Sequence, residues 1–142
     1  MAKANTDQKT EAKANGADTK PQTGLPLFYT KPVALDRKKH ADMHLNPKLD
    51  FSFASEVNAV PINMIELPNV MQFYPVAFST QSPATPLAIL GLRNNQNLFI
   101  DSKGQWEEGA YIPAYIRRYP FIFARDQSGD KLTLCIDDSK DV

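Results

Sequence analysis

The residues best suited to chemistry in this sequence are aromatic and arginine side chains gathered between positions 104 and 121. The members of this aromatic–arginine set are Trp106, Tyr111, Arg117, Arg118 and Tyr119. A guanidinium group stacks on aromatic rings and holds a carboxylate through two parallel hydrogen bonds. The set therefore predicts a surface that binds a peptide or another anionic group. The favoured alternative is structural, because buried aromatic residues mostly belong to the core: the rings would form a corner of the core, and the arginines would hold Asp residues within the fold.

Two histidines and a carboxylate occur together in the segment His40-Ala41-Asp42-Met43-His44. This segment is similar to the start of a metal site built from two His and one carboxylate. On a strand, however, residues four apart lie roughly 13 Å from each other, whereas a metal–nitrogen bond is about 2 Å. The sequence has no third histidine, so we expect two exposed histidines beside a basic turn and no metal. His40 remains a candidate ligand-binding residue, and an enzyme that uses His40 and Asp42 is the least favoured interpretation.

The remaining reactive side chains form no catalytic pattern. The single cysteine, Cys135, lies in an alternating apolar stretch close to Asp137, and an acidic neighbour disfavours the reactive thiolate. Glu107 and Glu108 are adjacent, and adjacent strand residues point to opposite faces. The sequence contains no nucleophile elbow, P-loop or dinucleotide-binding fingerprint. We therefore predict a protein that is not an enzyme, needs no cofactor and holds Cys135 packed in the fold.

The bulk composition indicates one domain and argues against two classes of partner. The 142 residues include 16 basic and 16 acidic side chains, so the formal net charge is zero. Nucleic-acid binding favours a clustered excess of Lys and Arg, so we predict no nucleic-acid partner. The longest apolar run, Pro86 to Leu92, is far shorter than the ~20 residues of a transmembrane helix. A single cysteine excludes an internal disulfide, which fits a reducing compartment.

The first 24 residues differ from the rest in composition. They repeat Ala-Lys-Ala-Asn and contain no apolar side chain larger than alanine after Met1. Such a segment buries too little apolar surface to offset its ordering entropy. We therefore predict a disordered tail over residues 1–24 and a folded domain over residues 25–142. The apolar stretch of a secretory signal is missing, so we expect the cytoplasm by default, with the cell surface reached only by a different export route.

Short elements separated by turns indicate an α+β domain, mainly an antiparallel sheet or meander with one or two short helices. Alternation over 41–45 and at Phe51 and Phe53 predicts extended segments. The best helix lies within 62–73, where Asn63 and Glu66 have capping-box spacing and Pro68 fits only the first turn. Strands are predicted at 76–78, 87–92, 98–100, 119–124 and 131–136, with turns at 93–96, 101–104 and 126–130.

Charge is uneven along the folded part of the chain. Residues 31–48 contain five basic and two acidic side chains, a net charge of +3. Residues 126–142 contain five acidic and two basic side chains, a net charge of −3. Two interpretations are open: the stretches lie near each other, or they are two solvated surfaces. We favour the second, because exposed ion pairs contribute little to stability.

The aromatic–arginine run also carries a family resemblance. Gly104-x-Trp106, Tyr111-Ile112-Pro113 and Arg117-Arg118-Tyr119-Pro120-Phe121 resemble the signature of the bacterial SapC family. Further similar pieces follow in the same order along the chain: Val33-Ala34-Leu35, His40, Phe51-Ser52-Phe53-Ala54, Val60-Pro61-Ile62, Glu66, Tyr74-Pro75-Val76, Phe78, Leu90-Gly91-Leu92, Asn97-Leu98-Phe99 and Leu134-Cys135-Ile136-Asp137. The resemblance as a whole covers roughly residues 25–138.

The resemblance implies a non-catalytic protein associated with the surface layer or cell envelope, acting through protein–protein contacts. It also implies that this chain holds only the N-terminal portion of a longer family pattern, which would leave the predicted strand Lys131–Ile136 as an open edge. Exposed edges invite pairing, so we expect a homo-oligomer through this edge. The alternative is a soluble module in the cytoplasm that binds a peptide or protein through the aromatic–arginine set.

Overall fold

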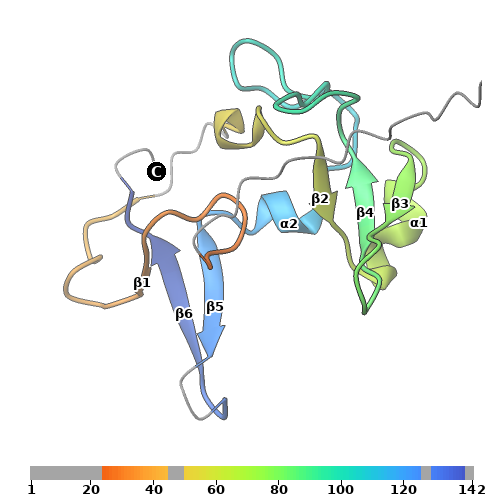
Figure 1. The fold of residues 1–142 in the computed structure, drawn as a ribbon. Helices are drawn as coiled ribbons and strands as arrows, with labels where there is room; N and C mark the ends of the chain where they lie inside the picture. The colour runs from red at the N-terminus through yellow and green to blue at the C-terminus, as the bar shows by residue number, and fades with distance from the viewer. Residues whose placement is uncertain (1–23, 45–49, 126–128, 140–142) are drawn as a thin grey trace, which may run out of the picture.

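Two small antiparallel sheets and a few short helical turns make up the fold (Figure 1). The structure, a computed structural model, describes residues 24–44, 50–125 and 129–139. The first sheet has the order β1-β6-β5, formed by Pro32–Ala34, Leu132–Asp137 and Phe121–Arg125. The second has the order β2-β4-β3, formed by Ala59–Pro61, Pro86–Ile89 and Val76–Phe78. The helical turns are η1 (Ser52–Ala54), η2 (Met64–Glu66), α1 (Leu67–Val70) and α2 (Ala114–Arg117).

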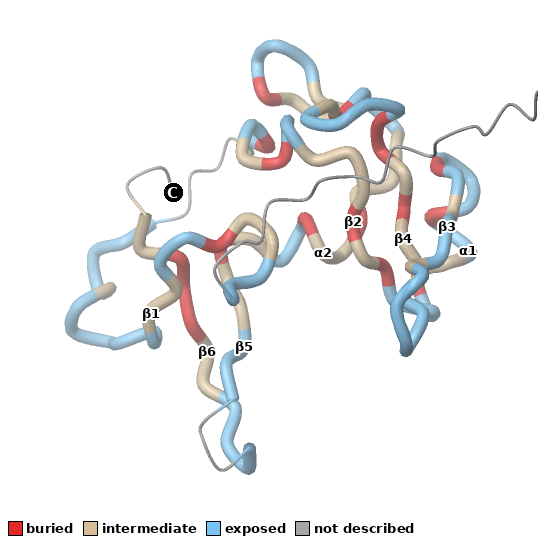
Figure 2. Tube along the Cα trace, in the orientation of Figure 1, coloured by how far each residue is buried: buried red, intermediate tan, exposed pale blue. Residues whose placement is uncertain are grey.

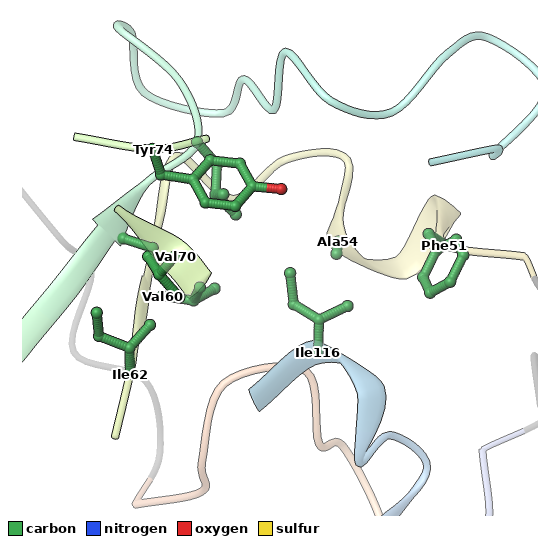
Figure 3. Packing of buried hydrophobic residues seen from close by; sticks show 9 residues of the cluster. Phe51, Ala54, Val60, Ile62, Val70, Tyr74 and Ile116 are labelled. Carbon is green, nitrogen blue, oxygen red and sulfur yellow. The ribbon is translucent and has the colours of Figure 1, made fainter. Parts of the chain in front are cut away.

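The core lies mainly between the second sheet and the helical turns, and α2 lies between the two sheets in Figure 1. Figure 2 shows buried stretches in β2, β4, β6 and α2, while long stretches of the loops are exposed. The buried apolar cluster consists of Phe51, Ala54, Val60, Ile62, Val70, Tyr74, Ala88, Leu90 and Ile116 (Figure 3). The predicted α+β class, mainly antiparallel, is confirmed. None of the helices in the described ranges is long and apolar enough to span a membrane.

The predicted helix within 62–73 is confirmed as a short one. Glu66 accepts a hydrogen bond from the Asn63 N–H at 2.9 Å, as the capping-box spacing indicates. The α-helix proper, α1, begins at Leu67 and contains Pro68 in its first turn, the only place where proline fits. It ends at Val70, and turns follow to Tyr74.

Three predicted strands, at 76–78, 87–92 and 131–136, overlap β3, β4 and β6, whereas other segments predicted as extended are not strands. Strand 76–78 coincides with β3, and strand 87–92 overlaps β4. The predicted strand at 41–45 is wrong over residues 41–44, which form turns and loop; residue 45 lies outside the described residues. The Asp36 carboxylate accepts the N–H groups of Lys38 and Lys39 at 2.8 Å each, so local hydrogen bonds begin a turn here instead.

The extended segment predicted at Phe51 and Phe53 is also wrong, because η1 occupies this stretch. The Asp50 carboxylate accepts the Ser52 N–H at 2.8 Å, which begins the turn. The strand predicted at 98–100 is reduced to a single bridge between Ile100 and Trp106.

The strand predicted at 119–124 appears as β5, which starts at Phe121 because α2 precedes it. The turn predicted at 101–104 is confirmed, with the Gly104 N–H donating to the Asp101 carbonyl at 3.0 Å. Residues 126–128 of the turn predicted at 126–130, and residues 1–23 of the tail predicted at 1–24, lie outside the described residues.

Strand β6 is the middle strand of its sheet, so the prediction that Lys131–Ile136 forms an open edge is wrong. Strand β1 covers one side and β5 the other, with Val33 opposite Ile136 and Ile122 opposite Cys135. Asp137 explains why β1 pairs here. Its buried carboxylate accepts the Thr30 N–H at 2.7 Å and the Lys31 N–H at 3.0 Å. Self-association itself stays a prediction, but it needs a different edge.

The basic and acidic stretches lie near each other, as in the less favoured of the two interpretations. Lys31 Nζ lies 3.3 Å and Lys39 Nζ lies 2.8 Å from the same Asp138 carboxylate oxygen. These two hydrogen bonds lower the pKa of Asp138, with Lys39 the larger cause. Cys135, by contrast, is buried as predicted.

Candidate functional site

The structure divides the predicted aromatic–arginine set between the core and the surface. Trp106 packs against the buried cluster, with its ring stacked on Phe99 at 6.2 Å and edge-on to Phe51 at 5.6 Å. Its indole N–H approaches the Tyr74 hydroxyl but makes no hydrogen bond of good geometry with a described group. Trp106 therefore lies at a corner of the core, as the structural alternative predicted for the aromatic rings.

Tyr111 belongs to a polar network centred on Glu66, which is only 5% exposed. The Tyr111 hydroxyl donates to Glu66 Oε2 at 3.0 Å, and the Ala114 N–H donates to the same oxygen at 2.9 Å. Arg117 Nη2 donates to the Tyr111 hydroxyl at 3.0 Å. The network thus ties the start of α2 to the η2–α1 turn and fixes the position from which Arg117 reaches the surface.

Burial and this network also set the acidity of two tyrosines. Burial raises the pKa of Tyr74 to about 12, and the nearby Trp106 indole opposes part of the rise. The Tyr74 hydroxyl donates to the Tyr111 carbonyl. Burial likewise raises the pKa of Tyr111, Glu66 adds to the rise, and Arg117 opposes it. Both hydroxyls therefore stay protonated donors at neutral pH.

Arg118 and Tyr119 rest on a second group of rings near the first sheet. The Arg118 guanidinium lies 3.8 Å from the centre of the Tyr115 ring and 5.6 Å from that of Tyr29. Tyr119 stacks on Phe53 at 4.2 Å. Arg118 is therefore held by cation–π contacts while its residue stays exposed.

Both arginines line one open groove of about 500 Å³, which we call the arginine groove. Its lining residues are Pro26, Arg117, Arg118, Phe121, Ile122, Phe123 and Leu134. Among the described residues, Arg117 and Arg118 contact tyrosines, whereas the structural alternative had them hold Asp residues. The groove runs along β5, whose outer edge faces no other strand of the described chain. Two cations, an apolar floor and an open strand edge therefore lie together.

The alternation of hydrogen bonds shows which part of β5 is open. The Asp137 N–H donates to the Pro120 carbonyl. The backbone N–H and C=O groups of Ile122 and Ala124 therefore point toward β6, and those of Phe123 point away from it, toward the open edge. At Phe121 the outer groups are already used, because its N–H donates to Arg118 and its carbonyl accepts from the Tyr29 hydroxyl. The open part of the edge begins at Phe123, whose side chain is 65% exposed.

His40 lies away from this groove, in the turn that follows β1. Its Nδ1 accepts the Asp36 N–H at 2.8 Å, and no described group pairs with its Nε2. In the described ranges, no three His, Cys, Asp or Glu side chains lie close enough together to hold a metal ion. His40 is therefore not brought together with Arg117, Arg118 or a carboxylate pair.

Glu66 and the groove floor are the parts of this region that sequence reasoning missed. The spacing from Asn63 predicted a cap for Glu66, but its contacts with Tyr111 and Ala114 cross more than forty positions of sequence. One signal was available: an acidic residue inside an apolar stretch is costly to bury unless backbone or hydroxyl donors meet it.

Comparison with known protein families identifies the family of this chain. A family model described as SapC matches residues 35–142. The chain belongs to the SapC family. The match includes all the lining residues of the arginine groove except Pro26. Comparison with curated proteins and with solved structures gave no match.

Proposed function

We propose that this SapC-family chain is a non-catalytic protein of the surface layer or cell envelope that acts by binding another protein. The observation that carries the proposal is the arginine groove, where Arg117 and Arg118 border an apolar strip of β5 and β6. Arginine and aromatic side chains are both enriched at protein interfaces. Family membership is the second support, and the envelope location follows from the family resemblance alone.

The groove favours an extended protein segment that ends in, or contains, a carboxylate. A carboxylate matches a guanidinium through paired hydrogen bonds. An extended backbone can add to the open edge of β5 from Phe123 onward, and apolar side chains at alternate positions then lie over the strand. Arg117 and Arg118 are already oriented by Tyr111 and Tyr115, which lowers the entropy lost on binding.

A peptide-binding experiment tests the groove. Fluorescence anisotropy compares an extended apolar peptide with a free terminal carboxylate and the same peptide with an amidated terminus. Wild-type protein should bind the free acid more tightly. Combined Arg117→Gln and Arg118→Gln should weaken that binding by roughly 10- to 100-fold, because each charge-assisted hydrogen bond is worth about 1.5–3 kcal/mol.

Arg93→Gln is the matched control, since Arg93 is exposed and lies outside the groove. Equal affinity of the double variant and the wild type would count against the groove. Labelling of intact native cells with a membrane-impermeant reagent then tests location. Labelled protein supports the envelope, whereas protein labelled only after lysis supports the alternative of a cytoplasmic peptide-binding module.

A further inference from the structure

The second sheet and α1 form a surface almost without charge. Residues 57–92 contain one charged side chain, Glu66, and it is buried. Large apolar side chains are nevertheless exposed here, with Ile65 at 89% and Phe78 at 58%. The other exposed large apolar residues of this segment are Met64, Met71, Phe73 and Leu92. Depletion of charge together with Met and Phe is typical of the centre of a protein interface.

A groove of about 410 Å³ lies within this surface, between α1 and β3, and we call it the β3 groove. Its lining residues are Leu67, Met71, Tyr74, Pro75, Val76 and Phe78. Val76 and Phe78 are two apart on β3, so their side chains point to the same face, the face of the groove. Phe78 is therefore both part of the wall and a projecting aromatic ring.

The outer edge of β3 has no strand partner among the described residues. The Ile89 N–H donates to the Pro75 carbonyl, and the Ser79 N–H donates to the Thr85 carbonyl. Odd-numbered residues of this strand therefore bond to β4, and the N–H and C=O groups of Val76 and Phe78 point outward. Figure 1 shows β3 as the outermost strand of its sheet.

This edge is self-complementary. If two β3 strands pair antiparallel about a two-fold axis at Ala77, Val76 of one copy faces Phe78 of the other. The outward N–H and C=O groups of these residues then bond to each other across the axis. Because both side chains share the groove face, the second copy's Phe78 lies beside Val76 over the β3 groove.

We infer that β3 pairs antiparallel with β3 of a second copy of this chain, which joins the two second sheets and buries each Phe78 against the other copy's β3 groove. The absence of exposed charge favours a second copy as the occupant, since at a two-fold axis every charged group would meet its like. An anionic membrane would instead be recognised by Lys or Arg, which this surface lacks. The inference does not depend on the arginine groove.

Sedimentation equilibrium over a concentration series tests this pairing. Wild-type protein should move from the mass of one chain to the mass of two as concentration rises. Phe78→Lys and Val76→Glu, made separately, should each abolish the two-chain mass, because each buries an unpaired charge in the interface. Combining the two substitutions should restore it, since the opposite charges then face each other across the axis. Leu98→Lys, on an exposed residue outside the surface of residues 57–92, should leave the association unchanged.

Hydrogen exchange provides a second measurement that does not depend on any variant folding. The amides of Val76 and Phe78 in the wild-type protein should exchange more slowly in concentrated than in dilute samples, while those of Phe123 should not change. A wild-type protein that keeps the mass of one chain at all concentrations overturns the inference and leaves the surface to a different partner. A two-chain mass that survives Phe78→Lys but is lost in Phe123→Lys also overturns it, and assigns association to β5.

Discussion

Two buried carboxylates act as anchors for backbone and hydroxyl donors. Glu66 accepts from Asn63, Tyr111 and Ala114, and Asp137 accepts from Thr30 and Lys31 among others. A buried carboxylate is stable only when hydrogen-bond donors replace its hydration. Apart from Asn63, the donors named here come from segments distant in sequence. These residues therefore hold the chain together at two points.

Glu66→Gln should destabilise the protein. The amide keeps one acceptor oxygen but presents an NH₂ group where Glu66 now meets two donors on Oε2, from Tyr111 and Ala114. Leaving a buried donor without its partner costs about 1–3 kcal/mol, so the free energy of unfolding in urea should fall by about that amount. Glu107→Gln, on an exposed residue, is the control. Equal urea midpoints for the two variants would show that Glu66 is not an anchor.

The Tyr74 hydroxyl should make folding sensitive to alkaline pH. Its pKa is raised from 10.0 to about 12 by burial. A group with a raised folded pKa contributes stability that is fully present below its unfolded pKa and is lost as pH rises through the folded value. Stability should therefore decline between pH 10.0 and about 12.

An ultraviolet titration of tyrosinate measures this step. The wild-type protein should show a late-titrating tyrosine near the upper end of that range, and Tyr74→Phe should remove it. Tyr115→Phe keeps the Tyr74 hydroxyl and should retain the late step. Loss of the late step in Tyr115→Phe instead would contradict the assignment.

At the scale of elements, the sequence predicted correctly the features that depend on residues close together in the chain. The capping spacing at Asn63, the turn ending at Gly104 and strand β3 all follow from residues within a few positions of each other. The position of β6 in the middle of its sheet was missed, because its pairing with β1 depends on Asp137 meeting residues more than a hundred positions earlier. Helix α2 was missed because Glu66 fixes its start from another element.

Only part of the candidate site could be predicted from the sequence. Composition singled out Arg117 and Arg118, which line one groove, since exposed arginines beside aromatics are a local pattern. Composition could not show that Trp106 belongs to the core and not to the groove, because its place depends on packing against Phe51 and Phe99 in the folded chain. His40 was kept from the site by its own turn at Asp36.

Gly104→Ala should weaken the turn that precedes Trp106. Gly104 has φ = +73°, and a Cβ there would collide with the Asp50 carboxylate and the Ser52 hydroxyl. Gly109→Ala is a matched control, since Gly109 has φ = +80° but open space around it. Left-handed backbone costs an alanine about 1–2 kcal/mol, so both variants lose that amount and Gly104→Ala loses more. Thermal unfolding compares them, and equal losses would contradict the predicted collision.

The whole molecule has two unlike surfaces. The first sheet carries the arginine groove and the ion pairs of Asp138 with Lys31 and Lys39, whereas the surface of residues 57–92 is nearly free of exposed charge. Under the two proposals, the arginine groove binds its partner through charge, and the surface of residues 57–92 binds a second copy through apolar contact. The first would weaken with added salt, and the second would not. Such a division suits a component of an assembly that contacts its own copies and a further protein.

The attachment of residues 30–31 and β1 to strand β6 should depend far more on Asp137 than on its neighbour Asp138. Asp137 is fully buried, and its carboxylate accepts the N–H groups of Thr30 and Lys31. Asp137→Asn removes one acceptor oxygen and should lower the free energy of unfolding by about 1–3 kcal/mol. Asp138→Asn should have little effect, because its lysine pairs are solvent-exposed. Hydrogen exchange of the β1 amides locates the loss: faster exchange in Asp138→Asn than in Asp137→Asn would mean that the exposed ion pairs, and not the buried carboxylate, hold β1 in place.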